Sequence, residues 1–232
     1  MNPTLYQFSG APRGWRVLLG LAFKGIQADV KNLDYSDRDH HKADFKTLNP
    51  RSTVPVLVAG ETTLRDSIAI LAWLDRAFPE QPLFGNTQEE AALIWQIAME
   101  CADYLREANR VLLTLAFSSN GEVPSAGSAA EETLKKGANL MHAECRYLEK
   151  LLSDGRPFLA GDRPTAADAV AFPEIRLLQR AVLTKNDMMA SVGFGYPPDH
   201  YPKTAIWKNR LNQMPEVAAT TPPHWNEELA TA

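Results

Sequence analysis

Cysteine, long apolar runs and an excess of charge of one sign are all lacking in this chain of 232 residues. The two cysteines, Cys101 and Cys145, are too few for a disulfide framework or a zinc site, and such sparse use is typical of a reducing compartment. The apolar runs, such as Val111 to Phe117, fall far below the ~18 residues that span a bilayer. The N-terminus also lacks the basic and apolar regions of a signal peptide. We therefore expect a cytoplasmic protein that is neither secreted nor inserted in a membrane.

The charges are nearly balanced, with 24 Lys and Arg against 28 Asp and Glu, and the sequence pI is about 5.8. No basic run is longer than Lys135-Lys136, so the chain lacks the electrostatic footprint of a protein that binds nucleic acid or an anionic membrane. A small anionic ligand needs only local charge and stays compatible with this balance. With 45% hydrophobic residues, the chain can bury one large core or two smaller ones.

The first eighty residues alternate strand and helix patterns. Apolar runs predict strands at Thr4–Phe8, Asp29–Leu33, Val56–Val58 and Glu61–Leu64, and helical periodicity predicts helices at Pro12–Lys24, Ala43–Leu48 and Asp66–Phe78. The resulting order is β-α-β-α-β-β-α. Pro79, Pro82 and Gly85 then break the pattern, so we place a domain boundary there, with residues 1–80 before it and 87–232 after it.

The second half is predicted to be all helical, with a loop at Ser118–Gly127. Cys101 and Cys145 fall on the apolar stripes of two of these helices, so we expect both thiols in the core rather than in reactive positions. The stretch from Thr184 to Tyr201 is rich in Gly, Pro and Met and is expected to form a long irregular loop. A last helix is expected near Trp207 and Leu211.

The junction of the first strand and first helix is a candidate anion site. Pro12 suits the first position of a helix, which makes Ala11 the N-cap residue. Alanine has no side chain that accepts a hydrogen bond, so the N–H groups of Arg13 and Gly14 are left for a bound anion or thiolate. A merely imperfect helix start explains the same residues equally well.

Pro55 stands between a loop, Asn49–Thr53, and a predicted strand. X-Pro bonds are the only peptide bonds for which the cis form costs little. A cis bond here would leave the N–H and C=O of Val54 free to pair with an extended peptide. An ordinary trans proline at the start of a strand is the alternative.

Two predicted helix starts carry acidic residues. Asp66 and Ser67 offer a carboxylate, a hydroxyl and unpaired N–H groups at the positive end of a helix dipole, which suits either an amino acid head group or simple N-capping. Thr165 and Asp168, which follow Pro164, fit a capping box, and we assign them to folding.

Together these motifs resemble the cytosolic glutathione transferase family over essentially the whole chain. The parts that carry the resemblance are, in order, Asn49-Pro50, Val54-Pro55-Val56-Leu57, Asp66-Ser67-Ile68-Ala69-Ile70 and the segment Gly161–Asp168. The resemblance implies an α+β fold, in which a thioredoxin-like domain for glutathione (1–80) precedes an all-α helical domain for the second substrate (87–232). It also implies a homodimer, and we expect no metal site.

The resemblance further implies a glutathione site built from backbone and polar groups. The cysteinyl part of the tripeptide would pair with the backbone of Val54, beside cis-Pro55. Its γ-glutamyl end would be held by Asp66 and Ser67. The residues near its glycine carboxylate would be His40 and, with less support, His41 or Thr53.

The chain departs from the family at the catalytic position. Aligned on Pro12, Arg16-Val17 and Lys24-Gly25-Ile26, it is most similar to the tau, omega and zeta classes and to related bacterial members. Their catalytic Ser or Cys falls where this sequence has Ala11. Alanine cannot donate a hydrogen bond, so another group must lower the pKa of the glutathione thiol, which for an ordinary thiol is about 8.5.

The candidates for this activation are charged or polar groups near Ala11. They are the N–H groups of the first helical turn with the helix dipole, the hydroxyl of Ser9 and the cation of Arg13, which we prefer. Tyr6 is an outside candidate because its spacing to Arg16 is one residue short of that in the tyrosine-type classes.

We therefore predict an enzyme, with detoxification as its role, that stabilises the thiolate of glutathione and adds it to a small apolar electrophile between the domains. The residues expected to line that cleft are Phe8, Trp15, Tyr104, Val111 and Leu112, with Phe172, Arg176 and the 184–201 loop as further candidates. For each apolar one, the sequence by itself favours a core position over a place in the cleft. Disulfide reduction is disfavoured because it would use a cysteine at position 11, whereas isomerisation, ether cleavage and dehalogenation stay open.

A non-catalytic binding or interaction module with the same fold is the alternative. Ala11 supports it, because the expected hydroxyl or thiol is missing. The otherwise complete set of glutathione contacts argues against it, since a scaffold has no physical need for Val54, Pro55, Asp66 and Ser67 together.

Overall fold

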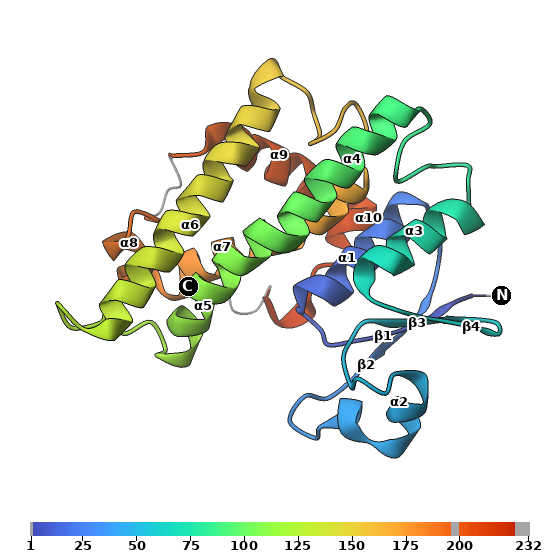
Figure 1. Cartoon of the computed structure of the whole chain (residues 1–232), viewed down its shortest axis with the longest axis horizontal. Helices are drawn as coiled ribbons and strands as arrows, with labels where there is room; N and C mark the ends of the chain where they lie inside the picture. The colour runs from blue at the N-terminus through green and yellow to red at the C-terminus, as the bar shows by residue number, and fades with distance from the viewer. Residues whose placement is uncertain (1, 196–199, 226–232) are drawn as a thin grey trace.

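A computed structural model describes residues 2–195 and 200–225 of the chain (Figure 1). One mixed sheet lies in the first part, with the order β2-β1-β3-β4. Its strands are β1 (Thr4–Gln7), β2 (Asp29–Asn32), β3 (Val56–Ala59) and β4 (Thr62–Arg65). β1 and β2 are parallel, and β3 is antiparallel to both β1 and β4. The predicted β-α-β-α-β-β-α order is thereby confirmed.

Helices cover the sheet and make up the rest of the chain. Those of the first part are α1 (Pro12–Phe23), α2 (Ala43–Leu48) and α3 (Ser67–Ala77), with a 3-10 turn at Asp39–His41. Those that follow are α4 (Gln88–Glu100), α5 (Arg106–Ser118), α6 (Ala129–Leu151), α7 (Ala166–Thr184), α8 (Asn186–Ser191), α9 (Pro202–Gln213) and α10 (Pro215–Ala218), with a π-helical segment at Cys101–Leu105 and a 3-10 turn at Leu152–Asp154. Figure 1 shows α1 and α3 on one face of the sheet and α2 on the other. The exact domain boundary between residues 80 and 87 stays a prediction.

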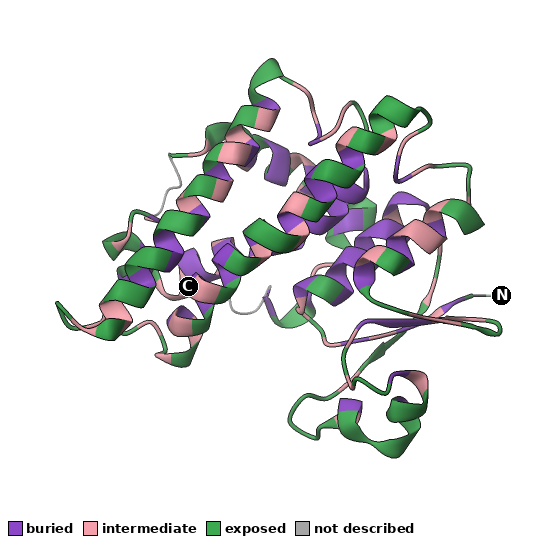
Figure 2. Ribbon diagram, in the orientation of Figure 1, coloured by how far each residue is buried: buried purple, intermediate pink, exposed green. Residues whose placement is uncertain are grey.

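Helix α7 forms the centre of the helical part. It is buried along most of its length and packs against α1, α4 and α5 (Figure 2). Its start has the predicted capping box, in which Asp168 Oδ2 accepts the N–H of Thr165 at 2.9 Å. The other oxygen, Oδ1, accepts the N–H of Leu159 at 3.0 Å and Nε1–H of Trp207 at 2.8 Å. This carboxylate therefore joins the start of α7 to α9, as its assignment to folding requires.

Both cysteines lie in the core, as predicted. Cys101 and Cys145 are 1% and 2% exposed, and burial raises the pKa of both thiols, that of Cys145 to about 12. Such thiols are protonated near neutral pH and therefore behave as small apolar groups.

The irregular loop predicted for residues 184–201 is wrong in its first part, whereas residues 192–195 are irregular as predicted. α7 continues to Thr184, and α8 follows at Asn186–Ser191. The reason is packing, because Met188 and Met189 are both fully buried and hold this turn of helix against the core. Residues 196–199 lie outside the described part of the chain. The last predicted helix is confirmed, since Trp207 and Leu211 are buried on α9.

A buried charge cluster joins α1 to the helical part. Arg16 Nη2 lies 2.9 Å from Oε1 of Glu174, whose side chain is fully buried on α7. The second oxygen, Oε2, accepts a hydrogen bond from Asn109 Nδ2 at 2.8 Å and lies 3.4 Å from Arg106 Nη1. Burial lowers the pKa of Arg16, and the charge of Glu174 opposes that shift. The sequence did not single out this cluster.

Within residues 2–195 and 200–225, no helix is long and apolar enough to cross a bilayer. The same residues contain no group of three or more His, Cys, Asp or Glu side chains that could hold a metal ion.

Candidate functional site

The strand register brings three predicted segments to one edge of the sheet. Tyr6 near the end of β1 pairs with Val56 at the start of β3, and Val56 pairs with Arg65 at the end of β4. β1 and β4 therefore end at the edge where β3 begins. The loop before α1, the segment before β3 and the start of α3 all lie at this edge, although they are far apart in the sequence.

Helix α1 begins as the sequence predicts. Ala11 is the N-cap residue and makes no side-chain capping bond, and Pro12 is the first helical residue. The first-turn N–H groups of Arg13 and Gly14 therefore have no partner from the cap. The side chain of Arg13 is exposed and makes no hydrogen bond or ion pair to a described residue, and Ser9 is exposed as well. The cation proposed for an anion is thus accessible, whereas Gly14, whose N–H is one of the proposed donors, is buried.

The Val54-Pro55 peptide bond is cis, which confirms that interpretation of the sequence. Across the described residues, neither the N–H nor the C=O of Val54 makes a backbone hydrogen bond. The preceding loop is held by Asn49, whose side-chain amide donates to the C=O of Thr53 at 2.7 Å and to its hydroxyl at 3.1 Å. Asn49 also accepts the N–H of Arg51 at 3.1 Å. The sequence analysis missed this positioning role, although an Asn in a proline-containing loop is a known signal for such a turn.

Asp66 and Ser67 form the start of α3. Asp66 Oδ1 accepts the N–H groups of Ile68 at 2.8 Å and Ala69 at 3.4 Å, so Asp66 is an N-cap. Its φ of +79° is in the left-handed region that non-glycine residues seldom adopt. No described residue hydrogen-bonds to Oδ2, and the buried hydroxyl of Ser67 also has no partner among the described residues. Capping by Asp66 therefore leaves one carboxylate oxygen for a ligand.

His40 lies in an aromatic cluster beside the loop before α1. Its ring stacks on Tyr35 with centroids 5.4 Å apart, and it meets Phe8 edge to face at 5.0 Å. The ring of His41 is 4.2 Å away. His40 is 9% exposed, and its Nδ1 has no hydrogen-bond partner within the described part of the chain. Phe8 is half-buried in this cluster, so the cluster connects the end of β1 to the predicted position of the glycine carboxylate.

Three of the predicted cleft residues, Tyr104, Val111 and Leu112, differ in how far their side chains are exposed. Tyr104 is 64% exposed in the π-helical segment, and Val111 is half-buried on α5. Leu112 is fully buried, and its backbone packs so closely on α6 that a Cβ at Gly137 would lie 2.7 Å from its nitrogen. Leu112 is therefore a core residue, which corrects the expectation that it lines a cleft.

Trp15 is also buried rather than exposed in a cleft. It is 1% exposed, and its Nε1–H donates to the hydroxyl of Thr220 at 2.7 Å. Its ring meets Phe172, itself fully buried, at 5.7 Å. These contacts place Phe172 in the core, which corrects the expectation for it. Trp15, although buried, lines a pocket with Ser9, Gly10 and Thr220 beside the loop before α1. Tyr6 packs against Phe45 of α2, on the face of the sheet away from α1.

The C-terminal segment folds back onto the loop before α1. Trp225 is 1% exposed and meets Trp15 edge to face at 5.2 Å. A Cβ at Gly10 would lie 2.9 Å from Trp225 Nε1 and 3.2 Å from the ring of His224. The imidazole of His224 therefore lies beside the residue that precedes Ala11. No local sequence pattern predicts a contact between the two ends of a chain, so the sequence analysis missed it.

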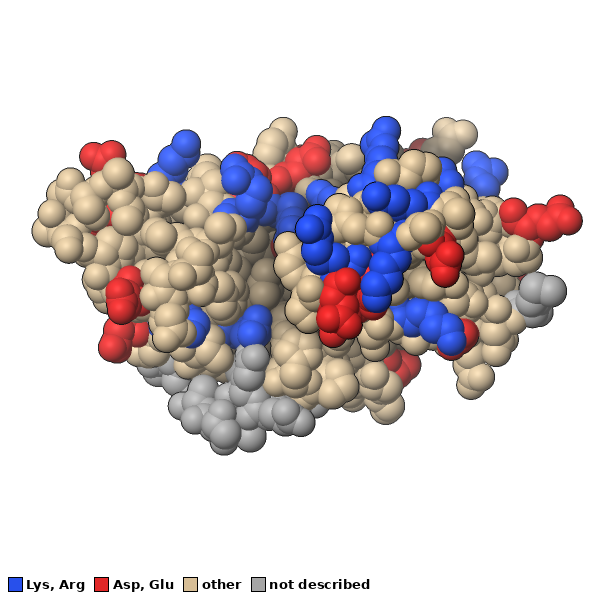
Figure 3. All heavy atoms as spheres, turned by 90° about the horizontal axis from the view of Figure 1, so that it is seen from below, with Lys and Arg blue, Asp and Glu red and all other residues tan. Residues whose placement is uncertain are grey.

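Figure 3 shows the same edge of the molecule from below. The surface is hollowed between the sheet half, on the right, and the helical half, on the left, and Lys and Arg side chains lie on both sides of the hollow. Such a distribution favours the approach of an anionic ligand.

Comparisons with known proteins assign the chain to a family. The models of the glutathione S-transferase N-terminal and C-terminal domains match residues 11–77 and 112–215. Glutathione S-transferase A of Pleuronectes platessa is 28% identical over 228 residues, which cover 97% of this chain and 93% of that protein. Glutathione S-transferase 1 of Dianthus caryophyllus is 31% identical over 172 residues, which cover 74% of this chain and 75% of that protein. The chain therefore belongs to the glutathione S-transferase family, which is a family of enzymes.

The solved structures agree with this assignment. The crystal structure of a glutathione S-transferase from the Antarctic clam Laternula elliptica is similar with a TM-score of 0.79 and 27% identity, covering 98% of this chain and 95% of that one. The predicted thioredoxin-like domain followed by an all-α domain is thereby confirmed as a glutathione transferase fold.

Proposed function

We propose that this chain binds glutathione, holds it as the thiolate and transfers it to a small apolar electrophile. The observation that carries the proposal is the convergence, at one edge of the sheet, of three sets of unpaired groups. These are the backbone of Val54, the free carboxylate oxygen of Asp66 with the hydroxyl of Ser67, and the uncapped start of α1. Membership of the family supports the choice of glutathione as the ligand.

The unpaired groups suit the parts of an extended tripeptide. The N–H and C=O of Val54, beside cis-Pro55, would pair with the cysteinyl backbone as one strand pairs with another. Asp66 would hold the γ-glutamyl ammonium, and the first-turn N–H groups of α3 with the hydroxyl of Ser67 would hold its carboxylate. His40 would lie near the glycine carboxylate, with Thr53 and His41 as alternatives.

The thiol would then lie at the start of α1. The N–H groups of Arg13 and Gly14, the helix dipole and the exposed guanidinium of Arg13 all favour a negative sulfur, and so lower the pKa of the thiol. Ser9 is a further candidate donor. The structure adds His224, whose imidazole lies beside Gly10 and is a candidate acceptor for the thiol proton.

The thiolate is the nucleophile in the reaction that we propose. Its sulfur forms a bond to the electrophilic carbon, and either a leaving group departs with the bonding electrons or the resulting carbanion takes up a proton. Phe8, Tyr104 and Val111, which retain exposed surface, are the predicted contacts for an apolar second substrate.

We also propose, from the family, a cytoplasmic homodimer with a role in detoxification. An apolar surface supports the dimer, because Trp95 and Met99 on α4 and Leu140 on α6 are 37%, 40% and 38% exposed.

The thiolate absorbance of glutathione, followed against pH with the purified protein, tests binding and activation together. We expect a bound thiol that titrates well below the free one. Asp66→Asn keeps an oxygen that can cap α3 but removes the charge for the γ-glutamyl ammonium, so glutathione affinity is expected to fall about tenfold or more. Asp187→Asn, at an exposed site on α8, is the matched control and should leave affinity unchanged.

Two results would contradict the proposal. Unchanged affinity in Asp66→Asn would show that the site is wrongly assigned. Binding without any shift in the thiol titration would favour the alternative of a non-catalytic module, because the start of α1 would then not stabilise a thiolate.

A further inference from the structure

Two neighbouring cations are buried in the helical half, and no residue of the described ranges is an acidic partner for either. Lys208 on α9 and Arg176 on α7 are each 8% exposed. The guanidinium of Arg176 hydrogen-bonds to Asn212 and lies 5.7 Å from the ring centres of Trp15 and Phe172. In residues 2–195 and 200–225, Lys208 Nζ has no hydrogen bond or ion pair, and Arg176 has no ion pair. The positive charge of Arg176 thus acts on Lys208, and the described residues provide no anion for either of them.

Such an arrangement is costly for the protein alone. A buried charge loses the water that would solvate it and is normally paired with an opposite charge. Burial, together with the positive charge of Arg176, lowers the pKa of Lys208 to about 8. Lys208 therefore remains mostly charged at neutral pH, and an anion at its ammonium would relieve this cost.

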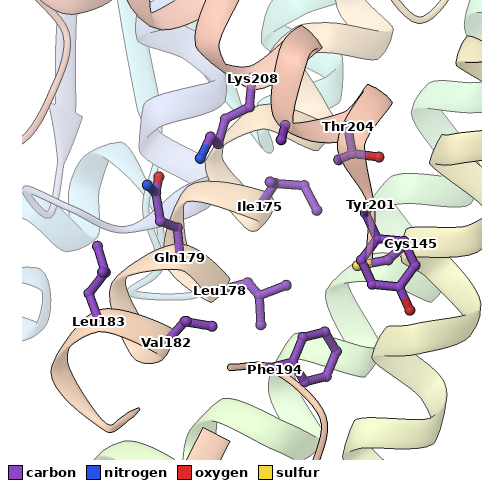
Figure 4. Close-up of a pocket in the computed structure, with 11 residues that line it drawn as sticks. Cys145, Ile175, Leu178, Gln179, Val182, Leu183, Phe194, Tyr201, Thr204 and Lys208 are labelled. Carbon is purple, nitrogen blue, oxygen red and sulfur yellow. The ribbon is translucent and has the colours of Figure 1, made fainter. Parts of the chain in front are cut away.

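A cavity lies beside Lys208, between α7 and α9 (Figure 4). Its volume is about 90 Å³, and its lining is mainly apolar. Figure 4 shows the ammonium of Lys208 and the amide of Gln179 at one end, and Leu178, Val182 and Phe194 toward the other. The cavity therefore has a positive end and an apolar end.

Two polar side chains of the cavity also lack partners. Gln179 Oε1 and Thr204 Oγ1 are buried and make no hydrogen bond to a described residue. Thr204 precedes Lys208 by one turn on the same face of α9. Gln179, Leu183 and Ala205 are half-buried, so part of the cavity wall is exposed at the surface. Rotation of the Gln179 amide by half a turn would present its N–H₂ group as a donor.

We propose that this cavity is a second ligand site, for a small aliphatic carboxylate whose charged group contacts Lys208 and whose chain contacts Leu178, Val182 and Phe194. The ammonium of Lys208, which lines the cavity, supplies the positive charge that a carboxylate requires. The volume limits the chain, because an apolar cavity of about 150 Å³ binds benzene and this one, at about 90 Å³, is smaller. We therefore choose a short chain of four carbons.

This site is separate from the sheet edge where we propose that glutathione binds. Its lining residues come from α6, α7 and α9 and from Phe194 and Tyr201 between α8 and α9, and none comes from the strands or from α1. The inference therefore stands or fails independently of the proposed transferase activity.

The test is a titration of the full-length protein with butyrate, monitored by ligand-observed NMR. 1-Butanol has the same chain without the charge, and butylammonium has the opposite charge. We expect butyrate to bind about tenfold more tightly than 1-butanol, because a hydrogen bond between two charged groups is worth more than a neutral one. Butylammonium should bind most weakly, and saturating glutathione should not displace butyrate.

Variants locate the binding. Lys208→Met keeps the length of the side chain and should reduce the affinity for butyrate to that for 1-butanol, whereas Lys208→Arg should restore much of it. Lys203→Met, at an exposed lysine on the same helix, is the matched control and should change nothing. Val182→Phe should fill the cavity and weaken butyrate and 1-butanol together.

The proposal is overturned if butyrate binds no better than 1-butanol, if Lys208→Met leaves butyrate affinity unchanged, or if glutathione displaces butyrate. The last result would place the carboxylate at the sheet edge instead. Circular dichroism of each variant separates a lost site from a lost fold.

Discussion

Besides Asp168 at its start, helix α7 carries two buried charged residues, Glu174 and Arg176, whose surroundings differ. Glu174 is paired with Arg16 and Arg106 and accepts a hydrogen bond from Asn109, so that its carboxylate is fully partnered. Arg176 lies beside Lys208, and the described residues provide no carboxylate for either of them. The carboxylate of Glu174 thus has its partners within the chain, whereas the described residues supply no anion for Arg176 and Lys208.

The difference separates a structural role from a binding role. A buried charge that has its partners holds two parts of the fold in register, since breaking the pair leaves an uncompensated charge. A buried charge that lacks partners destabilises the fold, so its presence is explained more readily by a ligand. The three predictions below test this contrast, beginning with the cluster around Glu174.

The largest effect is expected from Glu174→Gln. The amide keeps the volume but removes the negative charge, so Arg16 is left buried without an anion. We expect the free energy of unfolding to fall by about 3–5 kcal/mol, the range found when one partner of a buried pair is removed. Urea denaturation followed by circular dichroism measures it. Glu132→Gln, at an exposed site on α6, is the control, and an equally small change in both variants would remove the distinction between the clusters.

A rise in the free energy of unfolding, rather than a fall, is expected when the charge is removed from the Arg176 and Lys208 pair. Lys208→Met removes a buried charge that lacks an anion and leaves an apolar chain beside an apolar cavity. We expect the unfolding free energy at pH 7 to rise by about 2 kcal/mol, less than the full pKa shift implies because Lys208 retains some contact with water. A loss of stability would show that Lys208 has a partner in the folded protein.

The pH dependence of this gain has a defined direction. The pKa of Lys208 falls from 10.5 in the unfolded chain to about 8 in the folded one, so between these values the unfolded state binds more protons. Stability of the wild type therefore rises with pH across this window, and Lys208→Met lacks that contribution. The difference between the two proteins should be greatest below pH 8 and close as the pH rises toward 10.5. Parallel urea titrations at pH 7 and at higher pH measure it.

Local signals made much of the fold and of the sheet-edge site predictable. The proline at position 55, the alanine N-cap before Pro12 and the capping box at Thr165 each depend on residues close together in the sequence, and the structure has all three. The clusters of α7 were not predictable in this way. Their partners come from α1, α5 and α9, and periodicity indicates that a position is buried without indicating which charge lies opposite.

Contacts between segments that are distant in the sequence were not predicted, for the same reason. Trp15 and Leu112 are apolar residues of the kind that lines clefts. In the structure, Thr220 and Trp225 pack on Trp15, and α6 packs on Leu112 at Gly137. The prediction of a loop at residues 184–201 was wrong in its first part because Met188 and Met189 pack in the core. Methionine is compatible with many structures, so the sequence did not indicate this.

The smallest predicted effect extends the contrast to two helix starts. At Thr165 the start of α7 is completed by a capping box, whereas at Ala11 the start of α1 makes no side-chain capping bond. Ala11→Ser supplies a hydroxyl that can accept the N–H of Gly14, so we expect the unfolding free energy to rise by about 0.5–1 kcal/mol. Thr165→Ala, the reverse change, should lower it by about 1 kcal/mol.

When glutathione is bound, the serine hydroxyl can instead donate to the sulfur, which should lower the pKa of the thiol further than the wild type does. Urea denaturation and the thiolate titration measure the two effects. If Ala11→Ser changes neither, the donors at the start of α1 are already satisfied, and the proposed thiolate site loses its main support.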